Sequence, residues 1–110
     1  MVKVGFRVKL WMVNGEGEAV FGDGLAELIE SVDKYHSILE AAKQLNMSYR
    51  YALHRITLAE KRLGETLITR VRGGAKGGGS SEVTQYGRKL TEQYRKTQTE
   101  LRTFLENRAA

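Results

Sequence analysis

The chain has 110 residues, of which 41% are hydrophobic and 28% charged, so it is long enough for one domain with its own core. No run approaches the roughly 18 apolar residues of a membrane span, and the opening residues lack the pattern of a secretory signal. The chain contains no cysteine, which excludes disulfides and thiolate chemistry within it, and we expect a cytoplasmic, nucleoid-associated protein.

The formal net charge is +5, and the positive excess lies in the middle of the chain. Between Lys43 and Lys89 there are ten Lys or Arg against three Asp or Glu, whereas the flanks hold eight against ten. A concentrated basic surface attracts polyanions through counterion release, so double-stranded DNA is the first partner to consider. On charge alone, a basic surface that is merely solvated remains an alternative.

Residues 4–35 predict a hairpin followed by a helix. Apolar side chains alternate with others over residues 4–13, which is typical of a half-buried strand. These apolar residues are Val4, Phe6, Val8, Leu10 and Met12. Asn14-Gly15 predicts a tight turn with positive φ angles, and "EAVF" predicts the returning strand. A helix follows over about residues 24–35, with its apolar residues on one stripe.

Two further helices predict a helix-turn-helix over about residues 37–63. Ser37 begins a capping box with Glu40 and starts a short helix that ends at Asn46. Ser48 caps the next helix, "YRYALHRITLAEKRL", which ends at Gly64. Helices joined through so short a turn are typical of this motif. We expect small and aliphatic side chains to form the seam between the two helices: Ala41, Ala42, Leu45, Ala52, Ile56, Ala59 and Leu63.

The start of the second helix carries the side chains that we expect to meet DNA in the major groove. These are Ser48, Tyr49, Arg50, Tyr51, His54 and Arg55. Arg50 and Arg55 can pair with guanine or hold a phosphate, while Tyr49 and Tyr51 can pack on thymine methyl groups or phosphates. Ser48 suits a phosphate at the helix N-terminus. Two alternatives stay open: Tyr49 lies at the edge of the core, and His54 is simply solvated.

The glycine-rich run "GGAKGGG" lies between two predicted strands, at residues 67–72 and 82–84. It does not match a phosphate-binding loop, because Lys76 is followed by glycine and no helix begins there. A domain linker is also a poor interpretation, since a single helix follows Thr84. We therefore interpret residues 67–84 as a wing, a hairpin that reaches DNA beside the second helix. Its basic side chains are Arg70, Arg72 and Lys76.

Thr84 caps a long final helix over about residues 85–108, with apolar residues three or four apart. We interpret this stripe, with the helix at 24–35 beside it, as the seam of a homodimer. The expected dimer residues are Leu25, Leu28, Leu90, Tyr94, Leu101 and Leu105. The alternative is that the stripe packs back on its own domain.

Together these elements predict one domain over residues 1–110, mainly α with small β. We expect a winged helix-turn-helix with an N-terminal β-hairpin and a long C-terminal dimerisation helix. The sequence does not favour an enzyme, because His36 and His54 are the only histidines and lie apart from any carboxylate cluster. Ser80 and Ser81 have no base near them in the sequence. We expect no catalytic residue, metal, cofactor, readable small-molecule site or membrane partner.

Residues 37–90, from "SILEAAKQLN" to "VTQYGRKL", resemble the winged helix-turn-helix domain of the molybdate-dependent transcriptional regulators, the ModE family. The segments "AAKQLNMSYRYA", "RLGETLITR" and "GGAKGGG" carry the likeness. The chain is similar, more distantly, to the DNA-binding domain of LysR-type regulators. The resemblance implies a sequence-specific transcription regulator, a homodimer on a palindromic operator. By this resemblance, residues 48–50 correspond to the start of the recognition helix. Arg70, Arg72 and Lys76 correspond to basic residues of the wing.

The chain departs from the ModE family at two points. Tyr51 stands where the family often has a basic residue, so its base contacts can differ. The family's molybdate-binding half would follow the DNA-binding domain, whereas this chain ends after one helix, so we assign no residue to oxyanion binding. A fragment and a free-standing domain both fit, and the start methionine favours the latter. Two other functions stay open: an architectural protein that binds DNA without sequence preference, and a protein-interaction module.

Overall fold

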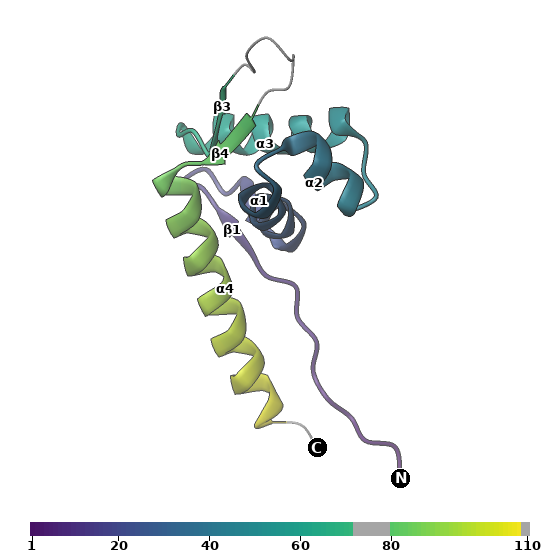
Figure 1. Ribbon diagram of the computed structural model, residues 1–110. Coiled ribbons are helices and arrows are strands. Elements are labelled where there is room, and N and C mark those ends of the chain that lie inside the picture. The colour runs from purple at the N-terminus through teal and green to yellow at the C-terminus, as the bar shows by residue number, and fades with distance from the viewer. Residues whose placement is uncertain (72–79, 109–110) are drawn as a thin grey trace.

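The computed structural model describes residues 1–71 and 80–108, and within them it has the mainly helical winged helix-turn-helix fold that the sequence predicts (Figure 1). Each of the two small sheets is an antiparallel hairpin. The elements are β1 (Trp11–Val13), β2 (Ala19–Gly22), α1 (Asp23–Tyr35), α2 (Ile38–Gln44), α3 (Tyr49–Leu63), β3 (Ile68–Val71), β4 (Ser80–Val83) and α4 (Gln85–Glu106).

The N-terminal hairpin is shorter than the sequence predicts. Only Trp11–Val13 pair with β2, and residues 1–10 belong to no strand. The alternation predicted a strand from residue 4, but within the described residues no other strand pairs with residues 4–10, and Val4 and Phe6 are 62% and 63% exposed. The turn also differs, because the positive φ angle falls at Gly17 (81°). The Asn14 side chain holds this turn by accepting hydrogen bonds from the backbone of Glu16 and Glu18 at 3.0 Å.

The helix-turn-helix forms as predicted. The Ser37 hydroxyl accepts a hydrogen bond from the backbone N–H of Glu40 at 3.0 Å, and the Ser48 hydroxyl accepts one from Tyr51 at the same distance. Asn46 takes the left-handed conformation, with φ at 55°, where the chain turns between α2 and α3. The predicted seam is confirmed, since its alanines and Ile56 are buried and its leucines are partly buried. Glu40 makes only half of the capping box, because its carboxylate accepts from Gln44.

A glycine lets α4 begin close to β3. A Cβ atom at Gly87 would lie 2.7 Å from the carbonyl oxygen of Leu67, a distance that real Cβ atoms do not tolerate. Thr84 caps the helix by accepting from the backbone of Gly87 at 3.0 Å. Its hydroxyl also donates to the carbonyl of Thr66 at 2.7 Å. The first turn of α4 is therefore fixed to the base of the β3–β4 hairpin.

Three of the predicted dimer residues belong to the core of the chain itself. Leu25, Leu28 and Tyr94 are 2%, 1% and 1% exposed, so they leave no surface for a partner chain. The alternative, in which this part of the stripe packs on its own domain, is correct for them. The physical reason is that α1 and the first half of α4 cover the β2 residue Phe21, whose ring centroid lies 5.4 Å from that of Tyr94. Leu90, Leu101 and Leu105 are only partly buried.

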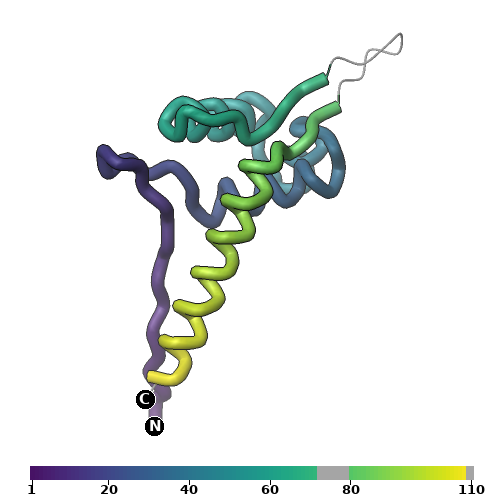
Figure 2. Tube along the Cα trace, turned by 90° about the vertical axis from the view of Figure 1, so that its left-hand side faces the viewer, coloured from purple at the N-terminus to yellow at the C-terminus, as the bar shows by residue number. Residues whose placement is uncertain are grey.

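The molecule is elongated, with extents of 63 × 33 × 21 Å and a radius of gyration of 16.5 Å. A compact domain of this length has a radius of gyration of about 13 Å. Figure 2 shows the cause: the second half of α4 and the N-terminal residues extend together away from the helix-turn-helix. Both termini therefore lie at the end of the molecule opposite the β3–β4 hairpin.

Candidate nucleic-acid interface

The first turns of α3 present polar and aromatic side chains to solvent. Tyr49 and Tyr51 are 41% and 47% exposed, so Tyr49 does not belong to the buried core. Arg50 and His54 are exposed as well. Ser48 holds the helix start by its cap bond, so the N-terminal end of α3 is well defined. The face that the sequence predicts for DNA is therefore free in the structure.

Arg55 differs from the other predicted residues because it lies back against the protein. Its Nη1 atom donates to the Tyr51 hydroxyl at 2.9 Å, and its guanidinium lies 5.8 Å from the centre of that ring. It also lies beside the start of α1, since a Cβ atom at Gly24 would be 3.6 Å from its Nη2 atom. These contacts orient the Tyr51 ring. They also occupy part of the Arg55 guanidinium, so fewer of its N–H groups are available to a base edge.

The β3–β4 hairpin lies at the same end of the molecule as α3 (Figure 1). Arg70 lies opposite Ser81 in the ladder and is exposed. Arg72 and Lys76, the other predicted wing residues, lie outside the described residues. Their contact with DNA therefore stays a prediction from the sequence.

Glu60 holds the hairpin in position relative to α3, a role that sequence reasoning missed. Its Oε2 atom accepts hydrogen bonds from the backbone N–H groups of Leu67 and Ile68, at 2.8 and 3.2 Å. The only sign of this role in the sequence is that Glu60 is an isolated acidic residue in a basic stretch. The spacing of residues does not indicate which groups it contacts. The carboxylate ties the first wing strand to the C-terminal half of the recognition helix.

A second set of contacts ties the wing to α1. The backbone N–H of Ser81 donates to the carbonyl of His36 at 2.9 Å. Beside it, the Nδ1 atom of His36 lies 3.3 Å from the Glu82 carboxylate. His36 ends α1 in the left-handed conformation, which turns its carbonyl toward β4. The wing base is thus held from two helices, so α3 and the wing keep a fixed separation.

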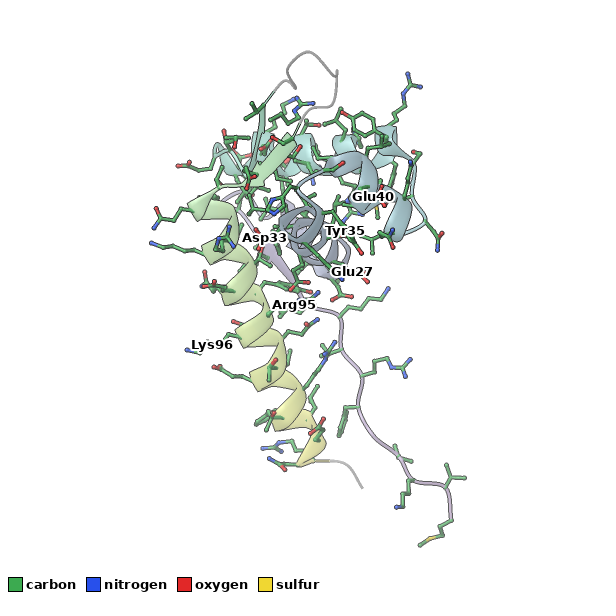
Figure 3. All side chains as sticks on the ribbon, viewed as in Figure 1. Glu27, Asp33, Tyr35, Glu40, Arg95 and Lys96 are labelled. Atoms are coloured by element: carbon green, nitrogen blue, oxygen red, sulfur yellow. The ribbon has the colours of Figure 1, made fainter. Side chains whose placement is uncertain are left out.

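Ion pairs on the other side of α1 fix the direction of α4. Arg95 points from α4 toward α1, whereas Lys96 beside it points away from the body (Figure 3). The Arg95 guanidinium contacts Glu30 at 2.7 Å and Asp23 at 2.7 Å. The hydrogen bond from Arg95 lowers the pKa of Asp23 below its usual value, and the bond to Glu30 raises the pKa of Arg95. These contacts hold α4 at a set angle to the helix-turn-helix.

Within residues 1–71 and 80–108, no group of three or more His, Asp or Glu side chains could hold a metal ion. None of the helices that the structure describes is long and apolar enough to cross a membrane. The candidate site offers cationic, hydroxyl and aromatic groups on an exposed surface. Such a set can bind the phosphates and base edges of a duplex.

Comparison with known proteins agrees with this geometry. Residues 25–88 match the family model described as bacterial regulatory helix-turn-helix protein, lysR family. The chain is also 34% identical over 84 residues to the molybdenum transport protein ModE of Azotobacter vinelandii. That alignment covers 76% of this chain and 31% of the relative, so the chain spans about a third of the relative's length. The family match runs from α1 to the first turn of α4 and includes both helices of the motif.

Proposed function

Since the chain belongs to the bacterial regulatory helix-turn-helix proteins of the LysR family, we propose that it is a DNA-binding transcription regulator that acts as a homodimer on a palindromic operator. Each protomer places α3 in the major groove of one half-site. Its wing contacts the phosphates or minor groove alongside. The operator then carries two inverted half-sites, one for each copy of α3.

The observation that carries this proposal is the exposed first half of α3, at the end of the molecule away from both termini (Figure 1). Arg50 forms no ion pair within the described part of the chain, so its guanidinium is available to a base or phosphate. The arginine fork matches the two acceptors of guanine in the major groove. Arg70 on β3 adds an exposed cation on the hairpin, suited to a phosphate.

The dimer part of the proposal is supported by the shape of α4. Its second half extends from the body, and Leu101 and Leu105 stay partly exposed along that half, as Leu90 does nearer the helix start. For two copies to read one duplex, both copies of α3 must face the same way. The two-fold axis therefore runs roughly along α4, which brings the two long helices side by side. Half-sites about one helical turn apart, roughly 34–36 Å, match such a dimer.

The first experiment is selection of genomic DNA fragments on the purified protein, followed by titration of any enriched site against a scrambled duplex. A palindromic site bound more tightly than the scrambled one would support the proposal. Binding without any enriched sequence would favour an architectural protein, and no binding at low salt would favour a protein-interaction module. The salt dependence measured on both duplexes separates phosphate contacts from base contacts.

A pair of variants tests the division of labour between α3 and the wing. Arg50→Ala should reduce the discrimination between operator and scrambled DNA by about 1–3 kcal/mol if Arg50 reads a base. Arg70→Ala should weaken binding to both duplexes alike and reduce the salt slope. Lys96→Ala serves as the matched control, because it removes a cation that points away from the body on α4. If Arg50→Ala and Arg70→Ala acted alike, helix and wing would not have separate roles.

A further inference from the structure

The exposed surface of α3 divides into an outermost stripe and two flanks. The stripe lies opposite the buried alanines and Ile56, and its members recur every three or four residues. They are Arg50, His54, Thr57 and Lys61, and all four are exposed. In a helix that lies in the major groove, the outermost stripe is nearest to the base edges, and the flanks face the phosphates of the two groove walls.

One flank of α3 lies on the side of α1. This α1-side flank consists of Tyr51, Arg55, Leu58 and Arg62, which follow one another at helical spacing. The last three line a groove against the first hairpin and the start of α1. Glu60, which holds the wing, lies about 140° round the helix from Arg55. The wing therefore serves one wall of the major groove, and contacts at the other wall must come from the α1-side flank.

The α1-side flank has two cations, and only Arg62 has an acidic partner among the described residues. Its Nε atom lies 3.5 Å from the Glu18 carboxylate, and its Nη1 atom donates to the carbonyl of Ala19 at 2.9 Å. Arg55 forms no ion pair within residues 1–71 and 80–108. Its partner there is the Tyr51 hydroxyl, which is neutral, so the positive charge beside that hydroxyl is not compensated.

The hydrogen bond from Arg55 determines what the Tyr51 hydroxyl can still do. A tyrosine hydroxyl has one hydrogen to donate and accepts through its oxygen. Here the oxygen accepts from the Arg55 Nη1 atom at 2.9 Å, and in the part of the chain that the structure describes the hydrogen has no acceptor. A hydrogen bond from a cation polarises the O–H group and strengthens the bond that it donates. Because Tyr51 is 47% exposed, its O–H group is a donor at the surface of this flank.

We propose that the Tyr51 hydroxyl donates a hydrogen bond to a backbone phosphate at the wall of the major groove away from the wing, and that Arg55 positions it for this contact. The inference rests on the proposed function, in which α3 lies in the major groove, and it gives each member of the pair its own role. A phosphate oxygen accepts without donating and carries negative charge, which suits a donor backed by an uncompensated cation. Tyr51 contacts the DNA, and Arg55 is a positioning residue that acts through it.

Direct contact between Arg55 and the phosphate is the alternative, and the surroundings of Arg55 disfavour it. Its side chain is only partly exposed. One end of the guanidinium is bound to Tyr51, and its Nη2 atom would lie 3.6 Å from a Cβ atom at Gly24. The guanidinium is therefore held between Tyr51 and the start of α1. Tyr51 lies nearer the outermost stripe than Arg55 by about 40° of helix rotation, so its side chain is closer to the duplex.

A double-mutant cycle tests whether the two side chains act as one. The dissociation constants of wild type, Tyr51→Phe, Arg55→Met and the double variant are measured on the enriched duplex and on a mixed-sequence duplex, the latter alone if no site is enriched. Tyr51→Phe should weaken binding to both duplexes alike by about ten-fold, as for loss of a hydrogen bond to a charged group. Arg55→Met should weaken binding of the wild type several-fold, but that of the Tyr51→Phe chain by less than about two-fold.

Two further variants test whether the effect is specific to this pair. Arg55→Lys keeps a cationic donor and should recover most of the affinity that Arg55→Met loses. Tyr49→Phe is the matched control for Tyr51→Phe, since Tyr49 is also exposed in the first turn of α3 but lies about 160° round the helix from Tyr51. Whatever Tyr49→Phe costs, the cost should be the same with Arg or Met at position 55. Helix content by circular dichroism should stay unchanged in every variant.

The outcomes separate failure of this inference from failure of the proposed function. Independent costs of Tyr51→Phe and Arg55→Met would overturn the positioning role of Arg55. A loss on the enriched duplex alone would mean that the hydroxyl reads a base, and would overturn the phosphate contact. Either result leaves the proposed regulator standing. A wild-type chain that binds neither duplex would refute the proposed function and this inference with it.

Discussion

As far as Gln98, α4 buries Gly87, Thr91, Tyr94 and Gln98 against the rest of the chain, whereas no residue from 99 to 106 is buried. The two parts belong to one helix with one repeating pattern, yet only the first packs into the core of the chain. An isolated helix of so few residues is marginal in water, so contacts and not propensity hold the first half in place. Periodicity in a sequence thus shows that a face is to be covered, without showing which chain covers it.

The largest contrast between the two halves should come from truncating their aromatic residues. Tyr94→Ala should lower the free energy of unfolding by about 3–5 kcal/mol, as for other fully buried aromatic side chains. Phe104→Ala should change it by less than about 0.5 kcal/mol in the monomer, as exposed substitutions do. Urea unfolding at several protein concentrations checks both values. Equal losses at the lowest concentration would mean that the halves do not differ as described.

A methyl group added at the start of α4 should have the next largest effect. Gly87→Ala should destabilise the fold by about 1–3 kcal/mol, because its Cβ atom would press on the Leu67 carbonyl and force the backbone apart. The control is Gly24→Ala in α1, where the nearest atom would be the end of the Arg55 side chain at 3.6 Å. That change should be neutral, or stabilising by up to about 1 kcal/mol through helix propensity. A stable Gly87→Ala variant would contradict the close approach.

Removing the Tyr94 hydroxyl should weaken the contact between the N-terminal residues and α4. Tyr94→Phe deletes the 2.7 Å hydrogen bond to the Leu10 carbonyl and should cost about 1 kcal/mol. We expect faster hydrogen exchange in β1 and unchanged exchange in α3, measured by mass spectrometry. Unchanged exchange in β1 after the substitution would show that this hydrogen bond does not hold the N-terminal residues.

The smallest effect concerns the ion pair of Asp23 with Arg95. Because the pKa of Asp23 is lowered in the folded chain, its contribution is present above the ordinary value of 3.8 and is lost as pH falls through the folded pKa. The carboxylate is well exposed, so we expect less than about 1 kcal/mol. Urea unfolding of wild type and Asp23→Asn at about pH 6 and about pH 2 should show a difference that vanishes in acid. A difference that grew in acid would have the wrong sign.

The sequence predicted the elements that local signals define. Ser37, Ser48 and Thr84 each cap the helix expected of them, and the alanines of the helix-turn-helix seam are buried as expected. It failed where the outcome depends on distant contacts. Alternation over residues 4–13 indicated an extended chain, but a strand also needs a partner, and one exists only from Trp11 onward.

The candidate site shows the same division between local and distant effects. The cap at Ser48 and the period of the helix placed Tyr49, Arg50 and His54 on its outer face. These local signals did not predict the position of Arg55, because that side chain lies against α1. They also did not indicate that Glu60 links α3 to β3. The stripe on α4 did not separate Tyr94 from Leu101, since both fit one repeat and only the body of the fold distinguishes them.

The hydrogen bond from the Tyr94 hydroxyl to the Leu10 carbonyl also limits how far the residues before Leu10 can reach from α4. Before Leu10 the chain has nine residues, 1–9, which span at most about 30 Å when extended. The helix beyond Tyr94 has twelve residues up to its end and rises only about 18 Å over them. The N-terminal residues are therefore longer than the part of α4 that follows Tyr94, so their tip can extend past the end of the helix while their base stays attached.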